Sequence, residues 1–190
     1  MAIFILASSS PRRHLLISEC GVEFTVGVKY DCEEDYPEHM PSEEVSLFLS
    51  KKKSEAYPEK LLEGEVLVTA DTTVIINGRV LGKPSTRNEA IEMLLSLSAT
   101  EHHVITAVTL RDKDHSHTFM ETSIVHFRKL TMNDIEFYVD NFNPYDKAGA
   151  YGIQEWIGEH GVERIEGSLS NIIGFPVERF KKEAKTFLLK

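Results

Sequence analysis

Short apolar runs of strand character alternate with segments of helical periodicity along this chain, and that alternation limits the fold more than any other feature. Ile3 to Ala7 is a strand-like run, and Pro11 and Gly21 suit the first turn and the end of a helix that follows it. The pair Asn77-Gly78 between apolar segments is typical of a β-hairpin. Because both crossover helices and hairpins are indicated, the sequence predicts an α/β fold with a mixed rather than purely parallel sheet.

Capping and turn residues set the expected bounds of the other elements. Ser42 is suited to cap a helix that Pro58 ends, and Thr86 with Glu89 forms the pattern of a capping box. The remaining helices are expected at 42–57, 86–97, 131–140 and 177–189, and the remaining strands at 66–70, 74–76, 79–81, 104–110, 119–127 and 162–165, with a loop-rich stretch at 143–161. The length of 190 residues fits one domain, residues 1–190, or two small lobes that share a cleft.

The acidic balance of the chain bears on its partners. A net charge of -9 disfavours polymeric DNA or RNA, whose backbones are usually held by a basic protein face, but a pocket with a few positive groups can still bind a small phosphorylated ligand. No apolar run has the length of a membrane span, and the apolar start lacks the positive region of a secretory signal. Cys20 and Cys32 form no CxxC pair, so neither disulfides nor a zinc site is expected, and the cytoplasm is the expected compartment.

The first candidate site is the run SSSPRR at 8–13. Arg12 and Arg13 lie in the first turn of the expected helix, where the helix dipole favours anions. A bound anion would explain them, because free N–H groups, hydroxyls such as that of Ser8 and two guanidinium groups can together hold a polyphosphate. The alternative is a surface helix whose arginines pair with acidic neighbours, and this segment alone supports both interpretations equally.

Asp71 is the second candidate. A carboxylate in an otherwise apolar pair of strands is costly unless it has a partner or a metal, so Asp71 is expected to interrupt the strand and lie where it ends in a cleft. A plain turn residue is the alternative. Lys83 after the hairpin and an acidic run that contains Glu33 add a phosphate and metal environment, and Mg²⁺ favours carboxylate oxygens. Asp71 and Glu33 are therefore the candidate metal ligands.

The third candidate is the segment DKAGAYGIQ at 146–154. Gly149 and Gly152 permit a close backbone approach, and Gln154 offers a donor and an acceptor to the edge of a base. Loop packing is the alternative. The eight histidines show no HExxH or other zinc spacing, so most of them are expected to be solvated.

Together these segments resemble the Maf family of nucleotide pyrophosphatases over nearly the whole chain. The matching pieces are LASSSPRR at 6–13, ADTTV at 70–74, GKP at 82–84, LSATEHHVITAV at 97–108, DKAGAYGIQ at 146–154 and GSLSNIIGFP at 167–176. The resemblance implies an elongated mixed twisted sheet with flanking helices and two lobes around a cleft, as in Maf and ITP pyrophosphatases. It also implies a divalent metal such as Mg²⁺ or Mn²⁺, hydrolysis of a nucleoside triphosphate to monophosphate and pyrophosphate, and a homodimer.

The resemblance assigns roles position by position. Ser8, Arg12 and Arg13 match the phosphate-binding turn, and Asp71 matches the proton acceptor. Lys53 and Lys83 match contacts to the phosphates or the transition state, and Glu33 matches more loosely as a metal or water partner. Lys147 lies in the matched substrate-binding segment.

Base preference is also implied by the resemblance. Arg12, Thr72 and Gln154 resemble the branch that acts on dTTP and UTP, including modified pyrimidine nucleotides, whereas the 7-methyl-GTP branch tends to have an aromatic residue, a glutamine and a glutamate there. A rival hypothesis is a regulator that binds nucleotides without hydrolysing them, because the family is also tied to arrest of septum formation. The pair Glu155-Trp156 departs from the family, which usually continues with glycines at this point.

Overall fold

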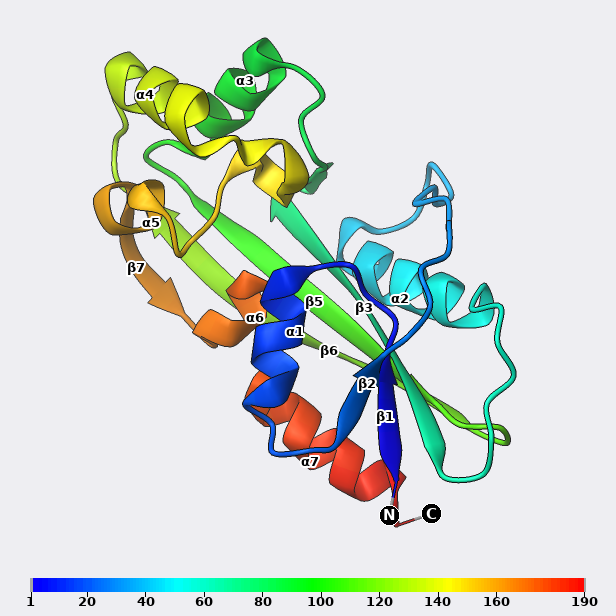
Figure 1. The fold of residues 1–190 in the computed structure, drawn as a ribbon. Coiled ribbons are helices and arrows are strands. Elements are labelled where there is room, and N and C mark those ends of the chain that lie inside the picture. Colours follow the sequence, from blue (N-terminus) through cyan, green and yellow to red (C-terminus); the bar gives the residue numbers. More distant parts are fainter. Residues whose placement is uncertain (1, 190) are drawn as a thin grey trace. The chain divides into compact units, whose positions relative to one another are not determined.

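The computed structural model describes residues 2–189 and contains a twisted seven-stranded sheet with flanking helices (Figure 1). The strands are β1 (Ile3–Leu6), β2 (Phe24–Val26), β3 (Glu65–Ile76), β4 (Arg79–Leu81), β5 (Glu101–Arg111), β6 (Ser116–Phe127) and β7 (Val162–Glu166). The α-helices are α1 (Pro11–Ser18), α2 (Val45–Glu55), α3 (Arg87–Leu97), α4 (Met132–Phe142), α5 (Trp156–Gly161), α6 (Leu169–Ile173) and α7 (Val177–Phe187). Three short 3₁₀ turns cover Ser42–Glu44, Pro144–Asp146 and Ala148–Ala150.

The sheet is mixed, as the sequence predicts. Its strand order is β2-β1-β3-β5-β6-β7, and β4 pairs with β3 outside this path. The pairs β1–β2 and β1–β3 are parallel, whereas β3–β4 and β6–β7 are antiparallel. Parallel neighbours require crossover connections, and these are supplied here by helices such as α1 and α2. The α/β class and the mixed sheet are thereby confirmed.

The residues group into two compact units. The first unit comprises the chain up to Asp71, the segment Thr106–Glu121 and the chain from Gly174 onward. The second comprises Thr72–Ile105 and Thr122–Ile173. The long strands β3, β5 and β6 each contribute residues to both units. Whether all 190 residues act as one domain stays a prediction.

Helices cover both faces of the sheet in the first unit. Successive side chains of β1 point to opposite faces. Phe4 contacts Phe180 of α7, with ring centroids 5.5 Å apart, while Ile5 packs with Tyr57 just beyond α2. The helices α7 and α2 therefore lie on opposite faces, and Figure 1 shows α1 beside α7.

The second unit has its own apolar core. It is formed by side chains of β3, α3, β6 and α4 that are at most 5% exposed, including Val74, Leu94, Phe127, Ile135 and Tyr138. Burial of one such side chain stabilises the fold by about 1.5–3 kcal/mol. The apolar positions Ala90 and Leu94 of α3 are buried as their helical spacing predicts, and the core gives α3 and α4 a common support.

The predicted strand–turn–helix at the start of the chain is confirmed. Pro11 is the first residue of α1, where its missing N–H costs no hydrogen bond. The helix ends at Ser18, and Gly21 adopts a left-handed conformation with φ of 68°. The strand, the turn and the helix therefore follow one another in the predicted order, and α1 begins at the predicted residue.

The helix α2 begins later than the sequence predicts. Residues Ser42–Glu44 form a 3₁₀ turn, Val45 is the first α-helical residue, and no side-chain capping bond is made at either start. The prediction that Ser42 caps the helix is therefore wrong, because Ser42 already lies inside the first tight turn. The helix ends at Glu55, three residues before Pro58.

Strand β3 runs without a break through Asp71. The expectation that Asp71 interrupts the strand and lies at its end is wrong, since β3 continues from Glu65 to Ile76. Asp71 is 6% exposed and forms an ion pair with Lys53 of α2. A charge that is compensated in this way can occupy a strand interior, which a hydropathy pattern alone does not indicate.

The expected hairpin is confirmed, and the expected capping box of α3 forms in part. Asn77 and Gly78 both have positive φ, at 49° and 72°, as a type I′ turn requires, and β4 pairs antiparallel with β3. Thr86 caps α3 by accepting from the Glu89 N–H at 3.2 Å, but the Glu89 carboxylate accepts from the N–H of Ser85, so only half of the predicted box forms. Helix α4 has a complete capping box.

The stretch 143–161 is less irregular than expected, because it contains two 3₁₀ turns and the helix α5. Strand β2 and helix α6 were not predicted. Both are short, at three and five residues, so their apolar pattern is too brief to indicate a period. The strand and helix expected at 162–165 and 177–189 are confirmed as β7 and α7.

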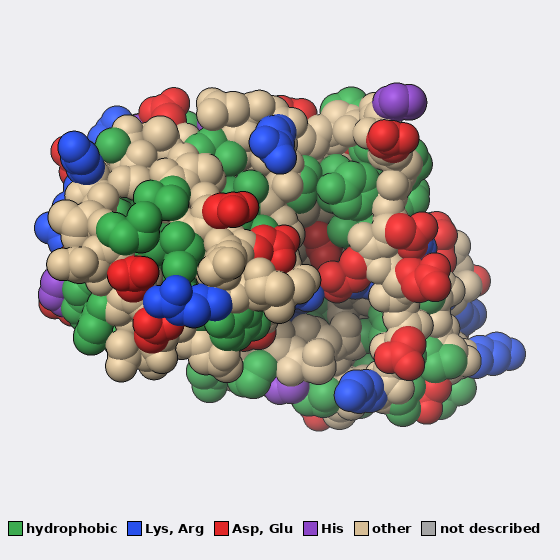
Figure 2. Space-filling model, turned by 90° about the horizontal axis from the view of Figure 1, so that it is seen from above, with side chains coloured by type: hydrophobic (Ala, Val, Ile, Leu, Met, Phe, Trp, Pro, Cys, Tyr) green, Lys and Arg blue, Asp and Glu red, His purple; other side chains and the backbone are tan. Residues whose placement is uncertain are grey.

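Charged side chains of both signs lie on the face drawn in Figure 2. On the face drawn in Figure 2, basic side chains are scattered among acidic and apolar ones rather than gathered in one area. The exclusion of polymeric nucleic acid stays a prediction from the net charge. Among residues 2–189, no helix is both long and apolar enough to cross a bilayer.

Candidate active site

An ion pair between Lys53 and Asp71 is the centre of the candidate site in the first unit. Lys53 lies in the last turns of α2, and its Nζ is 2.6 Å from Asp71 Oδ1 on β3. The side chains of Lys53 and Asp71 are 15% and 9% exposed. Because water is largely excluded from both groups, their attraction is screened less than that of a surface pair.

Glu34 is the second carboxylate on the same ammonium group. Its Oε1 lies 2.7 Å from Lys53 Nζ, and its side chain is 46% exposed. Lys53 therefore bridges a buried carboxylate and an accessible one. The sequence indicates the acidic run 33–35 and assigns the metal or water role to Glu33, which is exposed. In the structure Glu34 is the member that pairs with Lys53, and the role of Glu33 stays a prediction. The acidic run indicated a carboxylate in this segment, but not which member faces Lys53.

Arg13 belongs to the electrostatic neighbourhood of this pair. Burial lowers the pKa of Arg13, while the charges of Asp71 and Glu34 act to raise it. The guanidinium keeps its charge near neutral pH, and its Nε donates to the Gly174 carbonyl at 2.9 Å. Arg13, Lys53 and Asp71, which the sequence singled out separately, are thus brought together.

The turn before α1 has the features of an anion site. Ser8 Oγ accepts from the N–H of Ser10 at 3.2 Å, and the Ser8 carbonyl lies 2.6 Å from His14 Nε2. Ser10 makes no side-chain capping bond, and α1 has no acidic residue in its first turn. The positive end of α1 is therefore not compensated by a carboxylate of its own first turn. Arg12 and Arg13 add two cations to the same turn.

Hydrogen bonds at the C-terminal end of α2 hold Lys53 in place. The hydroxyl of Tyr30 donates to the Lys53 carbonyl at 2.6 Å, and Arg111 of β5 donates to the carbonyl and hydroxyl of Ser54 at 2.7 and 3.0 Å. Ser50, one turn earlier, hydrogen-bonds with Thr109 at 2.8 Å. The bonds to the Lys53 and Ser54 carbonyls satisfy groups that a helix end leaves without partners, and all of these contacts fix the helix against the sheet.

Strand alternation places Asp71 on the face that α2 covers. Thr69 donates to the Ser50 carbonyl at 2.8 Å, and Asp71, two residues further along β3, points to the same face. Ser46, Ser50 and Ser54 recur at four-residue spacing and are at most 1% exposed, so this face of α2 approaches the sheet closely. The sequence thus builds a narrow polar layer between α2 and β3.

The other predicted site residues lie in the second unit. Thr72 follows Asp71 on β3, and Lys83 follows β4, where the N–H of Gly149 donates to the Gly82 carbonyl at 3.0 Å. Gln154 is exposed. Thr72, Lys147 and Gln154 stay predictions as substrate-binding residues, Lys83 stays one as a catalytic contact to the phosphates, and Glu33 stays one as a metal or water partner.

Lys147 is buried in the second unit. It is 8% exposed, and its Nζ lies 2.7 Å from Asp146 Oδ1 and 3.1 Å from Glu155 Oε1. A buried ammonium group needs such partners, since its desolvation alone would cost several kcal/mol. The segment expected to contact substrate is therefore anchored by an internal ion-pair network.

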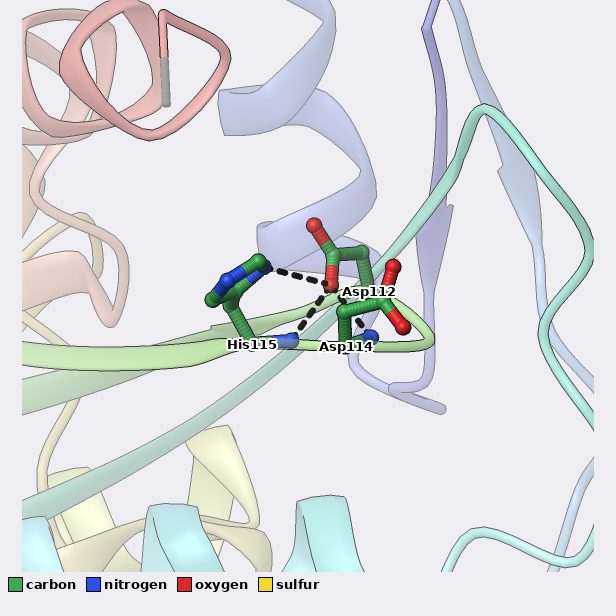
Figure 3. Close-up of side chains that lie close together, drawn as sticks. All are labelled: Asp112, Asp114 and His115. Carbon is green, nitrogen blue, oxygen red and sulfur yellow. Dashed lines mark hydrogen bonds and ion pairs between the residues drawn. The ribbon is translucent and has the colours of Figure 1, made fainter.

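His102 differs from the expected solvated histidines, whereas His115 is exposed as expected. His102 is 2% exposed, its Nε2 is 2.7 Å from the Tyr151 hydroxyl, and burial lowers the pKa of His102 to about 3. His115 lies in the turn between β5 and β6 beside Asp112 and Asp114 (Figure 3). Asp112 Oδ1 accepts from the N–H groups of Asp114 and His115 at 2.8 and 2.6 Å, so this cluster closes the turn through its own hydrogen bonds.

Comparison with known proteins identifies the family. A family model described as "Maf-like protein" matches residues 3–187. A dTTP/UTP pyrophosphatase of Parabacteroides distasonis is 46% identical over 183 residues, which are 96% of this chain and 95% of that protein. A dTTP/UTP pyrophosphatase of Porphyromonas gingivalis W83 is 43% identical over 185 residues, 96% of this chain and 93% of that protein.

A solved structure shows the same fold at much lower identity. A HAM1 protein from Coxiella burnetii aligns over 98% of this chain and 100% of its own, with a TM-score of 0.53 and 14% identity. This likeness concerns the fold alone. The family match and the close relatives together show that the chain belongs to the Maf family.

Proposed function

We propose that this protein hydrolyses dTTP and UTP to the nucleoside monophosphate and pyrophosphate. The names of relatives that are 41–46% identical over most of the chain support this substrate class. The observation that carries the proposal is the buried Asp71 carboxylate 2.6 Å from Lys53, with Arg13 in the same electrostatic neighbourhood. A carboxylate surrounded by cations is suited to direct water onto a polyphosphate.

In the proposed reaction, Asp71 accepts a proton from a water molecule that attacks the α-phosphorus. The bond between the α-phosphorus and the oxygen that leads to the β-phosphorus then breaks, and pyrophosphate leaves with that oxygen. Lys53, Lys83 and Arg13 stabilise the negative charge that develops on the phosphate oxygens. The ammonium of Lys53 already bridges Asp71 and the more exposed Glu34, so a phosphate oxygen could replace Glu34 as its second anionic partner.

The residues around Lys53 fit a divalent cation. Asp71 and Glu34 both approach one ammonium group, so two carboxylates, the oxygen ligands that Mg²⁺ and Mn²⁺ prefer, lie within a few ångströms of each other. We propose Asp71 and Glu34 as the principal metal-binding residues, with Glu33 beside them. A bound metal would neutralise phosphate charge and polarise a phosphoryl oxygen.

The pyrimidine preference is assigned to Arg12, Thr72 and Gln154. Their identities match the branch that acts on dTTP and UTP, and the exposed position of Gln154 leaves its amide available to a base edge. The proposal further includes a cytoplasmic location, a nucleotide rather than a polymer as partner, and a homodimer. Both cysteines, Cys20 and Cys32, are free thiols, which suits a reducing compartment.

Measurement of pyrophosphate release from a panel of triphosphates tests the proposal. The panel contains dTTP, UTP, dCTP, dGTP and 7-methyl-GTP, each with Mg²⁺, with Mn²⁺ and with a chelator. We expect turnover of dTTP and UTP that depends on the metal. A preference for 7-methyl-GTP would contradict the assignment of Arg12, Thr72 and Gln154. Binding of nucleotides without any hydrolysis would support the regulatory alternative instead.

A further inference from the structure

Glu155 belongs to the pair Glu155-Trp156, which stands directly after the matched segment 146–154 where the family usually continues with glycines, and its side chain contacts that segment. It lies at the N-terminal boundary of α5, directly after Gln154. Its backbone N–H donates to the Gly152 carbonyl at 3.0 Å, and its carbonyl accepts from the N–H of Gly158 at 2.8 Å. Both backbone groups of Glu155 are thus used to join the segment 146–154 to the helix.

The Glu155 carboxylate binds a different partner with each oxygen. Oε1 lies 3.1 Å from Lys147 Nζ, and Oε2 accepts a short hydrogen bond from the Tyr138 hydroxyl of α4. The side chain of Glu155 is 26% exposed, whereas that of Asp146, the other anion on Lys147, is 62% exposed. Glu155 is therefore the better-shielded partner of the buried lysine, and its contribution is weakened less by solvent.

The Tyr138 hydroxyl joins the carboxylate to the backbone of the same segment. It accepts from the N–H of Gly152 at 2.9 Å while it donates to Glu155. Burial and the Glu155 carboxylate raise the pKa of Tyr138, which favours the protonated hydroxyl that donates to Glu155. Tyr138 is fully buried in the core of the second unit and thus ties the segment to α4.

Gly152 leaves the space that the carboxylate occupies. A Cβ atom at this position would lie 2.8–3.1 Å from the carboxylate atoms of Glu155. A residue larger than glycine would therefore displace the carboxylate from Tyr138 or Lys147. The absence of a side chain at Gly152 is therefore what allows Glu155 to make both of these contacts.

We propose that Glu155, with Tyr138 and Lys147, forms a clamp that holds the segment 147–154 in the conformation in which Gln154 meets the base. In this arrangement Glu155 is a positioning residue for nucleotide specificity and does not contact the substrate. The inference rests on the proposed function, because it assumes that Gln154 contacts the base. It adds that the preference for pyrimidines depends on a residue outside the matched motif.

Steady-state kinetics of Glu155→Ala, Glu155→Gln and Tyr138→Phe test the clamp. A hydrogen bond to a charged group is worth about tenfold or more in an equilibrium constant. We therefore expect Glu155→Ala to raise KM for dTTP about tenfold, to leave kcat within about twofold, and to lower the preference for dTTP over dGTP. Glu155→Gln keeps one acceptor oxygen and should recover part of that preference. Glu159→Ala is the control, since Glu159 is an exposed residue of the same helix.

The outcomes separate the clamp from the proposed function. Failure of the wild type to release pyrophosphate from any triphosphate contradicts the proposed function. A wild-type preference that is unchanged in Glu155→Ala, or changed equally in Glu159→Ala, overturns the clamp. Hydrogen exchange of residues 147–154 tests the clamp without turnover: faster exchange is expected in Tyr138→Phe, which removes a single hydroxyl, and exchange at the wild-type rate would contradict it.

Discussion

Substitution of Asp71 by asparagine separates the catalytic role of the carboxylate from its structural one. Asparagine has nearly the same shape and retains one carbonyl oxygen for Lys53, but it cannot accept a proton from water. Loss of a general base costs about 10²–10⁴ in rate. We therefore expect kcat for dTTP to fall by about that factor, measured as pyrophosphate release at saturating metal, whereas the affinity for the nucleotide measured without metal changes little.

The stability cost of Asp71→Asn follows from the contacts of Lys53. Removal of one partner from a buried ion pair usually costs about 3–5 kcal/mol, because the remaining charge has no compensation. Here Glu34 stays 2.7 Å from the ammonium group, so we expect a smaller loss, about 1–2 kcal/mol. For a chain of this length that loss lowers Tm by about 2–8 °C, which scanning calorimetry can measure.

Asp140→Asn is the matched control for this prediction. Asp140 forms an exposed pair with Arg87 at 2.6 Å, and its side chain is 49% exposed. Because solvent screens an exposed pair of this kind, stability and turnover should both stay near the wild-type values. Turnover of Asp71→Asn within about threefold of the wild type would refute the assignment of Asp71 as proton acceptor. Equal losses of turnover in both variants would show that the effect is not specific to the site.

Three further outcomes are expected. Arg111→Ala removes two hydrogen bonds to the last turn of α2 and should lower kcat several-fold by loosening Lys53, with partial recovery in Arg111→Lys; an unchanged kcat would exclude this anchoring. Gly149→Ala should lower the free energy of unfolding in urea by about 1–3 kcal/mol, because φ at this position is 68° and a Cβ would lie 3.0 Å from Val74; a stabilised variant would contradict this. Burial lowers the pKa of His102 to about 3, so below about pH 6.5 the unfolded chain binds more protons than the folded one and the free energy of unfolding falls as the pH falls. Between pH 7 and 5 this residue should lower the free energy of unfolding by about 2 kcal/mol. In His102→Asn the free energy of unfolding should therefore depend less steeply on pH.

The fold class was predictable because its local signals are strong. The hairpin at Asn77-Gly78 needs positive φ at two adjacent residues, which few other residue pairs tolerate, and Pro11 marks the start of α1 directly. The unbroken path of β3 through Asp71 was not predictable in the same way. It depends on Lys53, 18 residues earlier in the chain, and a local hydropathy pattern contains no information on that partner.

In the candidate site too, some residues could be identified from local sequence signals, whereas others depend on tertiary contacts. Residue types and order pointed to Asp71 and Arg13, the family resemblance added Lys53, and the structure brings these three together. The choice between Glu33 and Glu34 depended on which carboxylate the irregular chain before α2 turns toward Lys53. No periodicity determines that direction in a segment without regular structure, so the sequence indicated the run but not the residue.

Different contacts position the catalytic residues and the residue proposed to select the base. Variants of the two sets of contacts should therefore have different kinetic effects. The position of Lys53 depends on the end of α2, which Arg111 holds, and its loss should appear mainly in kcat. The position of Gln154 depends on the Glu155 clamp, and its loss should appear mainly in KM and in base preference. Variants of both kinds could instead change kcat and base preference in parallel. A single network of contacts would then position both Lys53 and Gln154, and independent anchoring of α2 and of the segment 147–154 would not explain the activity.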